Sequence, residues 1–205
     1  MQCLSFLKPN HKSLSNVISR QKGVQFSYPE IGATATQTPD GYVVDHTRVS
    51  LGHGKPVFQS AKQALKRWQH MRLGWVDVWS PDNELHVGQD VAIMGWAMGA
   101  WWTNVCRIVY TVDEVGDVVQ FGFANGTLPG HIAKGEERFL LQWDQATDEV
   151  HYDILAFSKP NRLFIKLAYP IVRSHQKRFG QQSAAAMIKA AAKGACHETN
   201  ASVCM

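Results

Sequence analysis

The polar side chains that could do chemistry are most densely grouped between positions 130 and 138. The group comprises Gly130, His131, Gly135, Glu136, Glu137 and Arg138. A histidine can act as a general base, and a carboxylate and a guanidinium can orient the polar headgroup of a ligand. The alternative is a wide turn whose glycines adopt positive φ and whose Glu136 pairs with Arg138. No nucleophile accompanies the set, so we assign His131, Glu136 and Arg138 to ligand binding and no residue to catalysis.

Aromatic side chains form the second candidate set. They are Trp75, Trp79, Trp96, Trp101, Trp102, Phe121, Phe123 and Trp143. Aromatic rings bury a large area and fit flat apolar ligands, but an ordinary core would use the same side chains. Both interpretations stay open. We place Trp75, Trp96, Phe121 and Phe123 in the wall of a ligand site.

The sequence carries no pattern typical of a metal, nucleotide or hydrolase site. The nine histidines include no HxxxH or HExxH spacing and no cluster with cysteines, so we expect no metal. Walker, GxGxxG and GxSxG motifs are also absent, so we expect no cofactor. The region of the expected strands is net acidic, which argues against nucleic acid as a partner.

The composition indicates one globular domain. The chain has 205 residues, of which 45% are hydrophobic and 19% charged. No apolar stretch reaches the length of about 18 residues that a membrane-spanning helix needs. Four scattered cysteines and an N-terminus without an apolar signal segment favour a reducing compartment and argue against secretion. The oligomeric state stays open.

Charge is distributed unevenly along the chain. Residues 30–158 hold 16 acidic and 9 basic side chains, whereas residues 159–193 hold eight basic and no acidic ones. One explanation is attraction between the two regions, and the other is a basic surface for an anionic partner. Under the second explanation, Arg173, Lys177 and Arg178 contact an anionic membrane surface.

Hydrophobic periodicity predicts the elements that would position these residues. Alternation and turn residues indicate strands at 42–51, 75–79, 90–98, 103–113, 117–124, 136–143 and 150–157. Pro56 is expected to open a helix between the first two strands, because the first turn needs no N–H at that position. A long helix is expected to begin at Pro160 and to end at Gly194. Its inner face adds His175 and Phe179 to the ligand site.

The order of these elements defines the fold class. Short loops between strands favour an antiparallel meander, and its apolar face needs a cover. We predict an α+β fold in which a curved seven-stranded antiparallel sheet grips the long C-terminal helix. This is the helix-grip architecture of START and Bet v 1-like proteins, which encloses an apolar cavity. The expected organisation is an irregular segment at 1–27, the helix-grip domain at 28–194 and a flexible tail at 195–205.

Four segments resemble the DUF1990 (UPF0548) family of uncharacterised proteins. They are Tyr28-Pro29-Glu30 with Gly32-Ala33-Thr34, the Gly52-His53-Gly54 turn with the helix after it, Gly130-His131 with Gly135–Phe139, and Ala156–Pro160 leading to Tyr169-Pro170. The resemblance covers about residues 25–190 in the same order. It implies no established enzymatic activity. Plant members of the family are similar to a chloroplast outer-envelope pore protein.

These observations leave two functions. The first is a non-enzymatic module that binds a small apolar or amphipathic ligand between sheet and helix, in the cytoplasm or at a membrane surface. The second, implied by the resemblance alone, is a cation-permeable pore, an ion channel of the plastid outer envelope. Membrane-crossing strands need about 9–11 residues, and only the expected strands 42–51, 90–98 and 103–113 reach that length. Strand length therefore favours the ligand-binding module.

Overall fold

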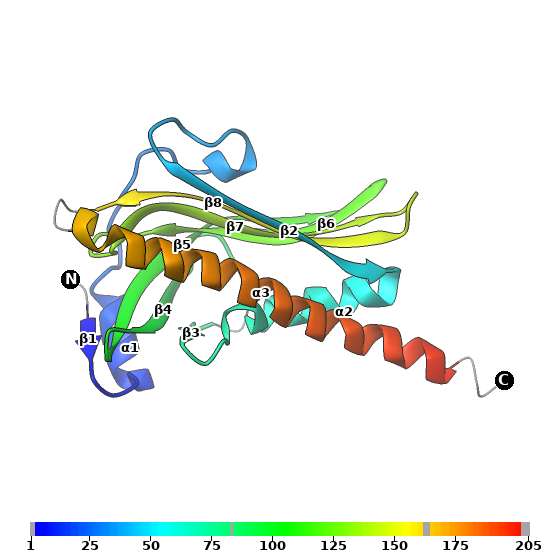
Figure 1. Cartoon of the computed structure of the whole chain (residues 1–205), viewed down its shortest axis with the longest axis horizontal. Helices are drawn as coiled ribbons and strands as arrows, with labels where there is room; N and C mark the ends of the chain where they lie inside the picture. The colour runs from blue at the N-terminus through cyan, green and yellow to red at the C-terminus, as the bar shows by residue number, and fades with distance from the viewer. Residues whose placement is uncertain (1–2, 83, 162–164, 202–205) are drawn as a thin grey trace.

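One sheet and one long helix dominate the molecule (Figure 1). The computed structural model describes residues 3–82, 84–161 and 165–201. Its elements, in chain order, are β1 (Cys3–Ser5), α1 (His11–Ser19), the 3-10 turn η1 (Ala33–Ala35), β2 (Val43–His53), α2 (Lys55–Lys66), the 3-10 turn η2 (Gln69–Met71), β3 (Val76–Trp79), β4 (Asp90–Ala97), β5 (Ala100–Glu114), β6 (Val118–Thr127), β7 (Ala133–Asp144), β8 (Glu149–Pro160) and α3 (Ile165–Ala201).

The sheet is antiparallel and follows the chain from β3 to β8. The strand order is β2-β8-β7-β6-β5-β4-β3, with β1 paired to β5 outside this path. Short turns place each strand beside its chain neighbour, whereas β2 is followed by α2 and pairs with β8 at the other end of the sheet. The sheet therefore has eight strands instead of the expected seven. The additional strand, β1, has three residues, too few for alternation to reveal it.

Bulges and close strand contacts curve the sheet. The register shifts between Ser50 and Gly52 in β2 and between Ile108 and Tyr110 in β5, and such shifts bend a strand and increase its twist. At Gly135 of β7, φ is 153°. A Cβ atom at this position would lie 1.9 Å from the backbone carbonyl oxygen of Phe157 in β8. Only glycine therefore allows β7 and β8 to approach this closely.

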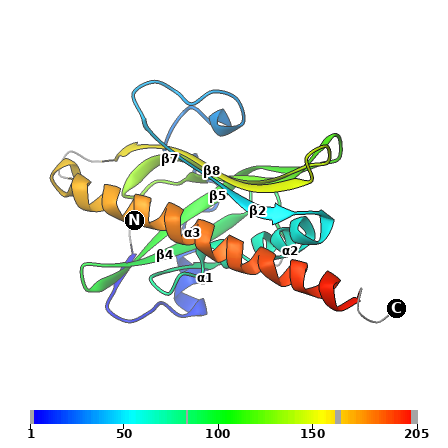
Figure 2. The ribbon, with the colours of Figure 1, turned by 45° about the vertical axis from the view of Figure 1, so that its right-hand side comes forward.

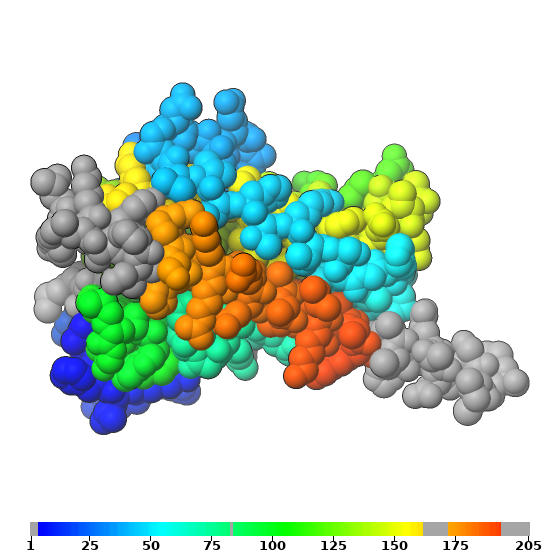
Figure 3. Space-filling model, in the orientation of Figure 1, coloured from blue at the N-terminus to red at the C-terminus, as the bar shows by residue number. Residues whose placement is uncertain are grey.

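Helices α2 and α3 cover the concave face of the sheet. Figures 1 and 2 show α3 crossing this face with α2 beside its C-terminal half, while the segment around η1 lies on the opposite, convex side. In the space-filling view, α3 (orange) lies between β2 and the segment of η2 and β3 (Figure 3). α2 contains Pro56 in its first turn and buries Phe58 and Leu65, which confirms the helix expected there.

The core has two parts, one on each face of the sheet. The larger cluster joins α2, α3 and the concave face through buried side chains such as Phe58, Phe139 and Met187. The smaller cluster joins α1 to β4 and β5 and includes Leu14 and Ile18. Successive residues of β4 and β5 alternate between the two clusters because side chains along a strand point to opposite faces.

The N-terminal segment is not irregular as expected. Residues 11–19 form α1, and the side chain of its N-cap Asn10 accepts a hydrogen bond from the backbone nitrogen of Ser13 (3.0 Å). Only Leu14 and Ile18 of this helix are buried. A short helix with two inward side chains produces little periodicity, and its cap is the stronger signal.

The ends of α3 also differ from those expected. The helix begins at Ile165, and Pro160 instead ends β8, a position where a missing N–H is tolerated. Residues 162–164 lie outside the described part of the chain. Gly194 does not end the helix, which continues to Ala201, because a glycine among alanines costs only about 1 kcal/mol of helix stability. Of the expected tail at 195–205, residues 202–205 lie outside the described chain.

Strand length does not argue against a pore, contrary to our expectation. β5, β7 and β8 have 15, 12 and 12 residues. Backbone pairing continues past the point where hydrophobic alternation ends, so the periodicity underestimated these lengths. The concave face is instead covered by α3 and by side chains of the larger core cluster.

Replacing Phe139 by alanine should lower the free energy of unfolding by about 3–5 kcal/mol. The Phe139 side chain is 0% exposed, and its ring centre lies 4.5 Å from that of His70 and 5.5 Å from that of Phe123. Urea unfolding measures the change, with Val115→Ala as the control because Val115 is 87% exposed. A loss below about 1 kcal/mol at Phe139 would contradict its place in the core.

Candidate ligand-binding cavity

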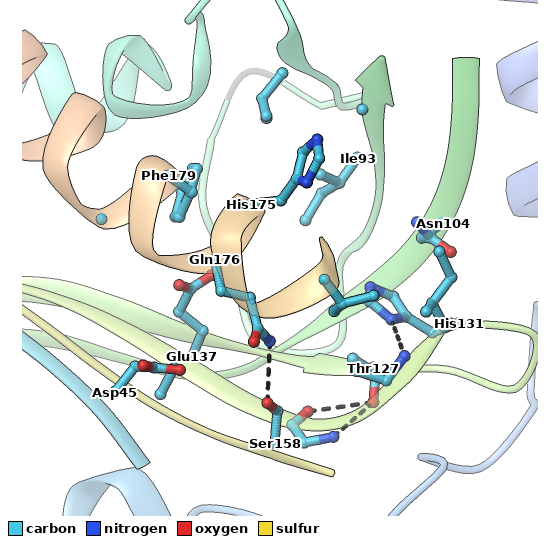
Figure 4. A pocket seen from close by; sticks show the side chains of 18 of the residues that line it. Asp45, Ile93, Asn104, Thr127, His131, Glu137, Ser158, His175, Gln176 and Phe179 are labelled. Atoms are coloured by element: carbon cyan, nitrogen blue, oxygen red, sulfur yellow. Dashed lines mark hydrogen bonds between the residues drawn. The ribbon is translucent and has the colours of Figure 1, made fainter. Parts of the chain in front are cut away.

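A cavity of about 690 Å³ lies between the concave face of the sheet and α3. Its walls include Trp75, Ile93, Ile154 and Phe179. Figure 4 shows His175 and Phe179 projecting from α3 around this space, with the strands opposite. Small-molecule sites have volumes of about 300–1,000 Å³ and mostly apolar walls, so the cavity has the size and character of such a site.

Polar contacts hold α3 on the sheet along one side of the cavity. The guanidinium of Arg173 donates to both carboxylate oxygens of Asp45 on β2, with Nη2 2.6 Å from Oδ1. The Gln176 amide donates to the Ser158 hydroxyl at 3.1 Å (Figure 4). At Gly180 a Cβ atom would lie 3.0 Å from the Thr47 hydroxyl oxygen. Glycine at this position lets the helix approach β2.

The cavity opens between the β4–β5 turn and α3. Among the residues that line it, Met98 is 76% exposed and Trp96 is 39% exposed. Lys177 and Gln181 of α3 also line the cavity and are exposed. We call these four exposed positions the mouth of the cavity, whereas β6 and β8 contribute buried wall residues such as Asn125 and Phe157.

A row of side chains crosses the cavity floor from β2 to β6. Strand register pairs Asp45 with Ala156, Ala156 with Glu137, and Glu137 with Asn125. All four residues line the cavity. Residues directly opposite in neighbouring strands have Cβ atoms about 4.5–5.5 Å apart on one face. The short Ala156 side chain therefore separates two carboxyl groups, of which Asp45 alone is paired with a cation among the described residues.

Glu137 is an uncharged acid at neutral pH. Burial and, to a smaller extent, the nearby carboxylate of Asp45 together raise its pKa to about 8. In the described part of the chain, no hydrogen bond or ion pair reaches its carboxyl group. A protonated carboxyl group can both donate and accept a hydrogen bond, so Glu137 offers both capacities to the cavity.

Further polar groups of the cavity wall lack partners within the described residues. The side-chain nitrogen of Asn125 and the side-chain oxygen of Asn104 are buried without a hydrogen bond. His131 accepts a hydrogen bond at Nδ1 from the backbone nitrogen of Ala133 (3.1 Å). Burial lowers the pKa of His131 to about 4, so its ring is neutral at pH 7. The deep wall thus presents uncharged hydrogen-bonding groups among apolar ones.

The structure brings together six of the nine side chains assigned to a ligand site. The six that line the cavity are Trp75, Trp96, His131, Glu136, His175 and Phe179. The rings of Trp75 and His175 meet edge to face at 5.5 Å. Phe121 and Phe123 belong instead to the larger core cluster, because they lie further along β6, under α2. Ligand contact by the five other than Glu136 remains a prediction.

The carboxylate of Glu136 does not face the cavity that its residue borders. It accepts hydrogen bonds from the hydroxyl of Tyr28 (2.7 Å), from the backbone nitrogen of Gly32 (2.7 Å), and from the backbone nitrogen (3.0 Å) and hydroxyl (2.5 Å) of Thr34. These donors lie on the convex side. Glu136 therefore anchors the N-terminal segment, because alternation along β7 points it away from Glu137.

Arg138 lies on the same convex side and does not line the cavity. Its guanidinium donates to Asp153 (2.8 Å) and to the backbone oxygen of Thr34 (2.9 Å), so the expected pairing with Glu136 is wrong. Burial alone would raise the pKa of Asp153, but hydrogen bonds from His46 and Arg138 hold it below its usual range. Arg138 is a structural residue of the convex face.

The expected outward surface of Arg173, Lys177 and Arg178 is only partly present. Arg173 pairs with Asp45, and its side chain is 19% exposed. It therefore ties α3 to the sheet, as the first explanation of the charge pattern expects. Lys177 and Arg178 are exposed, and the Arg178 guanidinium lies 4.6 Å from the centre of the Trp75 ring.

Glu137, Asn125 and Asp45 also line the cavity, although no sequence pattern assigned them to a ligand site. A signal for Glu137 was present, since it is the one acid on a face of β7 that otherwise carries Phe139, Leu141 and Trp143. A lone carboxyl group on an apolar face needs a partner or a raised pKa. Asn125 and Asp45 become visible only through strand register, which the sequence does not show.

Sequence comparisons identify relatives along most of the chain. The model of a family described as a domain of unknown function (DUF1990) matches residues 27–186. A UPF0548 protein of Dictyostelium discoideum is 34% identical over 203 residues, which cover 90% of this chain and 94% of the relative. A UPF0548 protein of Arabidopsis thaliana is 34% identical over 154 residues, which cover 73% and 74%.

The fold is also similar to that of a solved structure. The crystal structure of human STARD10 superposes with a TM-score of 0.50 and 10% sequence identity, over 91% of this chain and 81% of the other. At this identity the similarity shows the fold alone. The expected helix-grip architecture, with a curved antiparallel sheet around a C-terminal helix, is confirmed.

Helix α3 is the longest helix, with 37 residues. Neither α3 nor any other helix in the described ranges has a stretch that is long and apolar enough to cross a membrane. Nor do the described residues include three His, Cys, Asp or Glu side chains grouped as metal ligands.

Replacing Glu137 by glutamine should raise the free energy of unfolding at about pH 9 and leave it nearly unchanged at about pH 4. The folded pKa of about 8 lies above the ordinary 4.5. Ionisation of Glu137 therefore costs stability as the pH rises between these values. Glutamine keeps the shape without the charge, so we expect a gain of at least about 1 kcal/mol in urea unfolding at the higher pH.

The neighbouring Glu136→Gln variant is the matched control. It replaces a carboxylate that accepts four hydrogen bonds by an amide. The NH₂ group of the amide cannot accept a hydrogen bond from the donors that face it. It should destabilise the protein by about 1.5–3 kcal/mol at about pH 9. Equal responses of the two variants would contradict the opposite placement of Glu136 and Glu137.

Proposed function

We infer that this chain, which belongs to the family of the domain of unknown function DUF1990, binds a small apolar or amphipathic molecule between the sheet and α3. The supporting observation is the cavity of about 690 Å³, with walls that include Trp75, Ile154 and Phe179. Protein interiors are usually packed as densely as organic crystals. An apolar ligand that fills this space gains about 25 cal/mol for each Å² of apolar surface removed from water.

A binding role fits the cavity better than catalysis does. Cys106 lines the cavity, but burial raises the pKa of its thiol far above neutrality, and a thiol is a poor nucleophile unless it ionises. Nδ1 of His131 is occupied by the backbone nitrogen of Ala133. Acyl transfer requires a nucleophile paired with a base.

The finer part of the proposal places the cavity mouth at an anionic membrane surface. Met98 and Trp96 are exposed there, and Lys177 and Arg178 of α3 supply positive charge. Apolar and aromatic side chains beside cations are the combination that partitions into a membrane interface. Arg173 is not part of this surface, since it pairs with Asp45. A ligand could then exchange directly between lipid and cavity.

Protein purified from cells should carry a small molecule that native mass spectrometry detects as an added mass. Ala156→Leu should reduce the occupied fraction severalfold, because the larger side chain fills the space between Asp45 and Glu137. Ala185→Leu is the matched control, since Ala185 is exposed on α3. No added mass together with stepwise conductance in planar bilayers would replace this proposal by the pore.

The purified protein should sediment with vesicles that contain anionic phospholipid, and this binding should weaken at high salt. The double variant Lys177→Gln/Arg178→Gln should lose most of the binding, because each removed charge contributes up to about 1 kcal/mol of binding free energy. Lys189→Gln/Lys193→Gln removes the same charge from exposed positions further along α3 and should bind almost normally. Equal losses in both variants, or binding that salt leaves unchanged, would contradict a docking role for the mouth.

A further inference from the structure

We propose that Glu137 and Asn125 form a polar pole inside the cavity and that the ligand is an uncharged amphipathic molecule whose hydroxyl group binds there. This inference rests on the proposed ligand-binding function and specifies the chemical class of the ligand. A hydroxyl group both donates and accepts hydrogen bonds. It therefore complements a carboxylic acid and a carboxamide that lie side by side.

Strand register places the two groups together. Asn125 of β6 is directly opposite Glu137 of β7, so their side chains leave the sheet on the same face at about 4.5–5.5 Å between Cβ atoms. Both residues line the cavity. On the other side of Glu137, the methyl group of Ala156 leaves room for a ligand atom.

Both groups lack partners in the described structure. Asn125 is 3% exposed, and its side-chain nitrogen makes no hydrogen bond. The Glu137 carboxyl group also has no hydrogen bond or ion pair within the described chain. Buried polar groups are almost always satisfied by protein, water or a ligand. One hydroxyl group at this position could accept from the amide nitrogen and exchange a hydrogen bond with the acid.

Charge around the pole favours a neutral headgroup. Asp45 of β2, Cys106 of β5 and Tyr152 of β8 interact electrostatically with Glu137. The other titratable or charged residues that line the cavity are His46, His131, Lys134, Glu136, His175 and Lys177. Asp45 is paired with Arg173, and Lys177 is exposed at the mouth. An anionic headgroup deep in the cavity would lie beside two acids, and burying a charge without a partner is costly.

A cationic headgroup fits less well because an ammonium group only donates hydrogen bonds. It would leave the side-chain nitrogen of Asn125 without an acceptor. It would also require Glu137 to ionise, although burial holds the pKa of this acid near 8. The hydroxyl group satisfies both members of the pole without a change of charge.

Three probes with the same ten-carbon tail distinguish these headgroups: decan-1-ol, decylammonium and decanoate. Trp75, Trp96 and Trp102 line the cavity, so the change in tryptophan fluorescence reports binding. At about pH 6.5 decan-1-ol should bind at least about tenfold more tightly than either charged probe. At about pH 9 its affinity should fall about tenfold, because one pH unit above the pKa leaves about a tenth of Glu137 protonated.

Variants test each member of the pole. The affinity of Glu137→Gln for decan-1-ol should be the same at both pH values, and it should equal the affinity of the unaltered protein at the lower pH. Asn125→Leu should weaken this binding about five- to tenfold. Asn104→Leu removes the other unpartnered amide of the cavity wall and should weaken binding less than Asn125→Leu. Asn16→Leu, at an exposed position of α1 outside the cavity, is the matched control and should bind normally. Urea unfolding of each variant confirms that it is folded.

Four results would overturn the proposal. Tightest binding of decylammonium, lost in Glu137→Gln, would show that the pole binds cations. A loss in Asn104→Leu but not in Asn125→Leu would place the pole elsewhere in the cavity. Equal binding of all three probes would remove the polar pole and leave the proposed function intact. No fluorescence response to any probe would remove both.

Discussion

The ion pair between Arg173 and Asp45 positions α3 over the sheet, and the cavity depends on that position. The pair ties the cavity end of the helix to β2, while Ser183 and Met187 pack into the core further along the helix, each 0% exposed. Between these two anchors α3 spans the floor that carries Glu137. Partial burial makes such a pair more effective than an exposed one, because water and salt screen it less. The helix is therefore held near the sheet without filling the space beneath it.

Two adjacent glutamates on β7 lie on opposite faces of the sheet, in different surroundings. Glu136 accepts four hydrogen bonds on the convex side and joins the segment around η1 to the sheet. Glu137 faces the cavity, where burial keeps it protonated at neutral pH. The two side chains differ in surroundings only because a strand alternates its faces. A shift of one residue in the β7 register would exchange these roles and leave both carboxyl groups in unsuitable surroundings.

Local patterns predicted the architecture better than they predicted the site. Alternation located seven strands, and Pro56 located the start of α2, because these signals depend only on neighbouring residues. Pro160 misled because proline also suits the end of a strand. For the site, residue chemistry suggested Glu136 and Arg138, but both side chains form hydrogen bonds with Thr34 on the convex face. The pairing of Glu137 with Asn125 arises from the register of β6 and β7, which is a long-range property.

The open cavity and the unsatisfied polar pole have a common physical origin. Apolar side chains that closed the space would bury Glu137 and Asn125 without partners, which costs free energy. The small side chain of Ala156 preserves that room. A molecule that binds only the folded protein also stabilises it, by about 2.7 kcal/mol at a hundred times its dissociation constant. Under the proposed function, the groups whose burial costs stability are those that the ligand would satisfy.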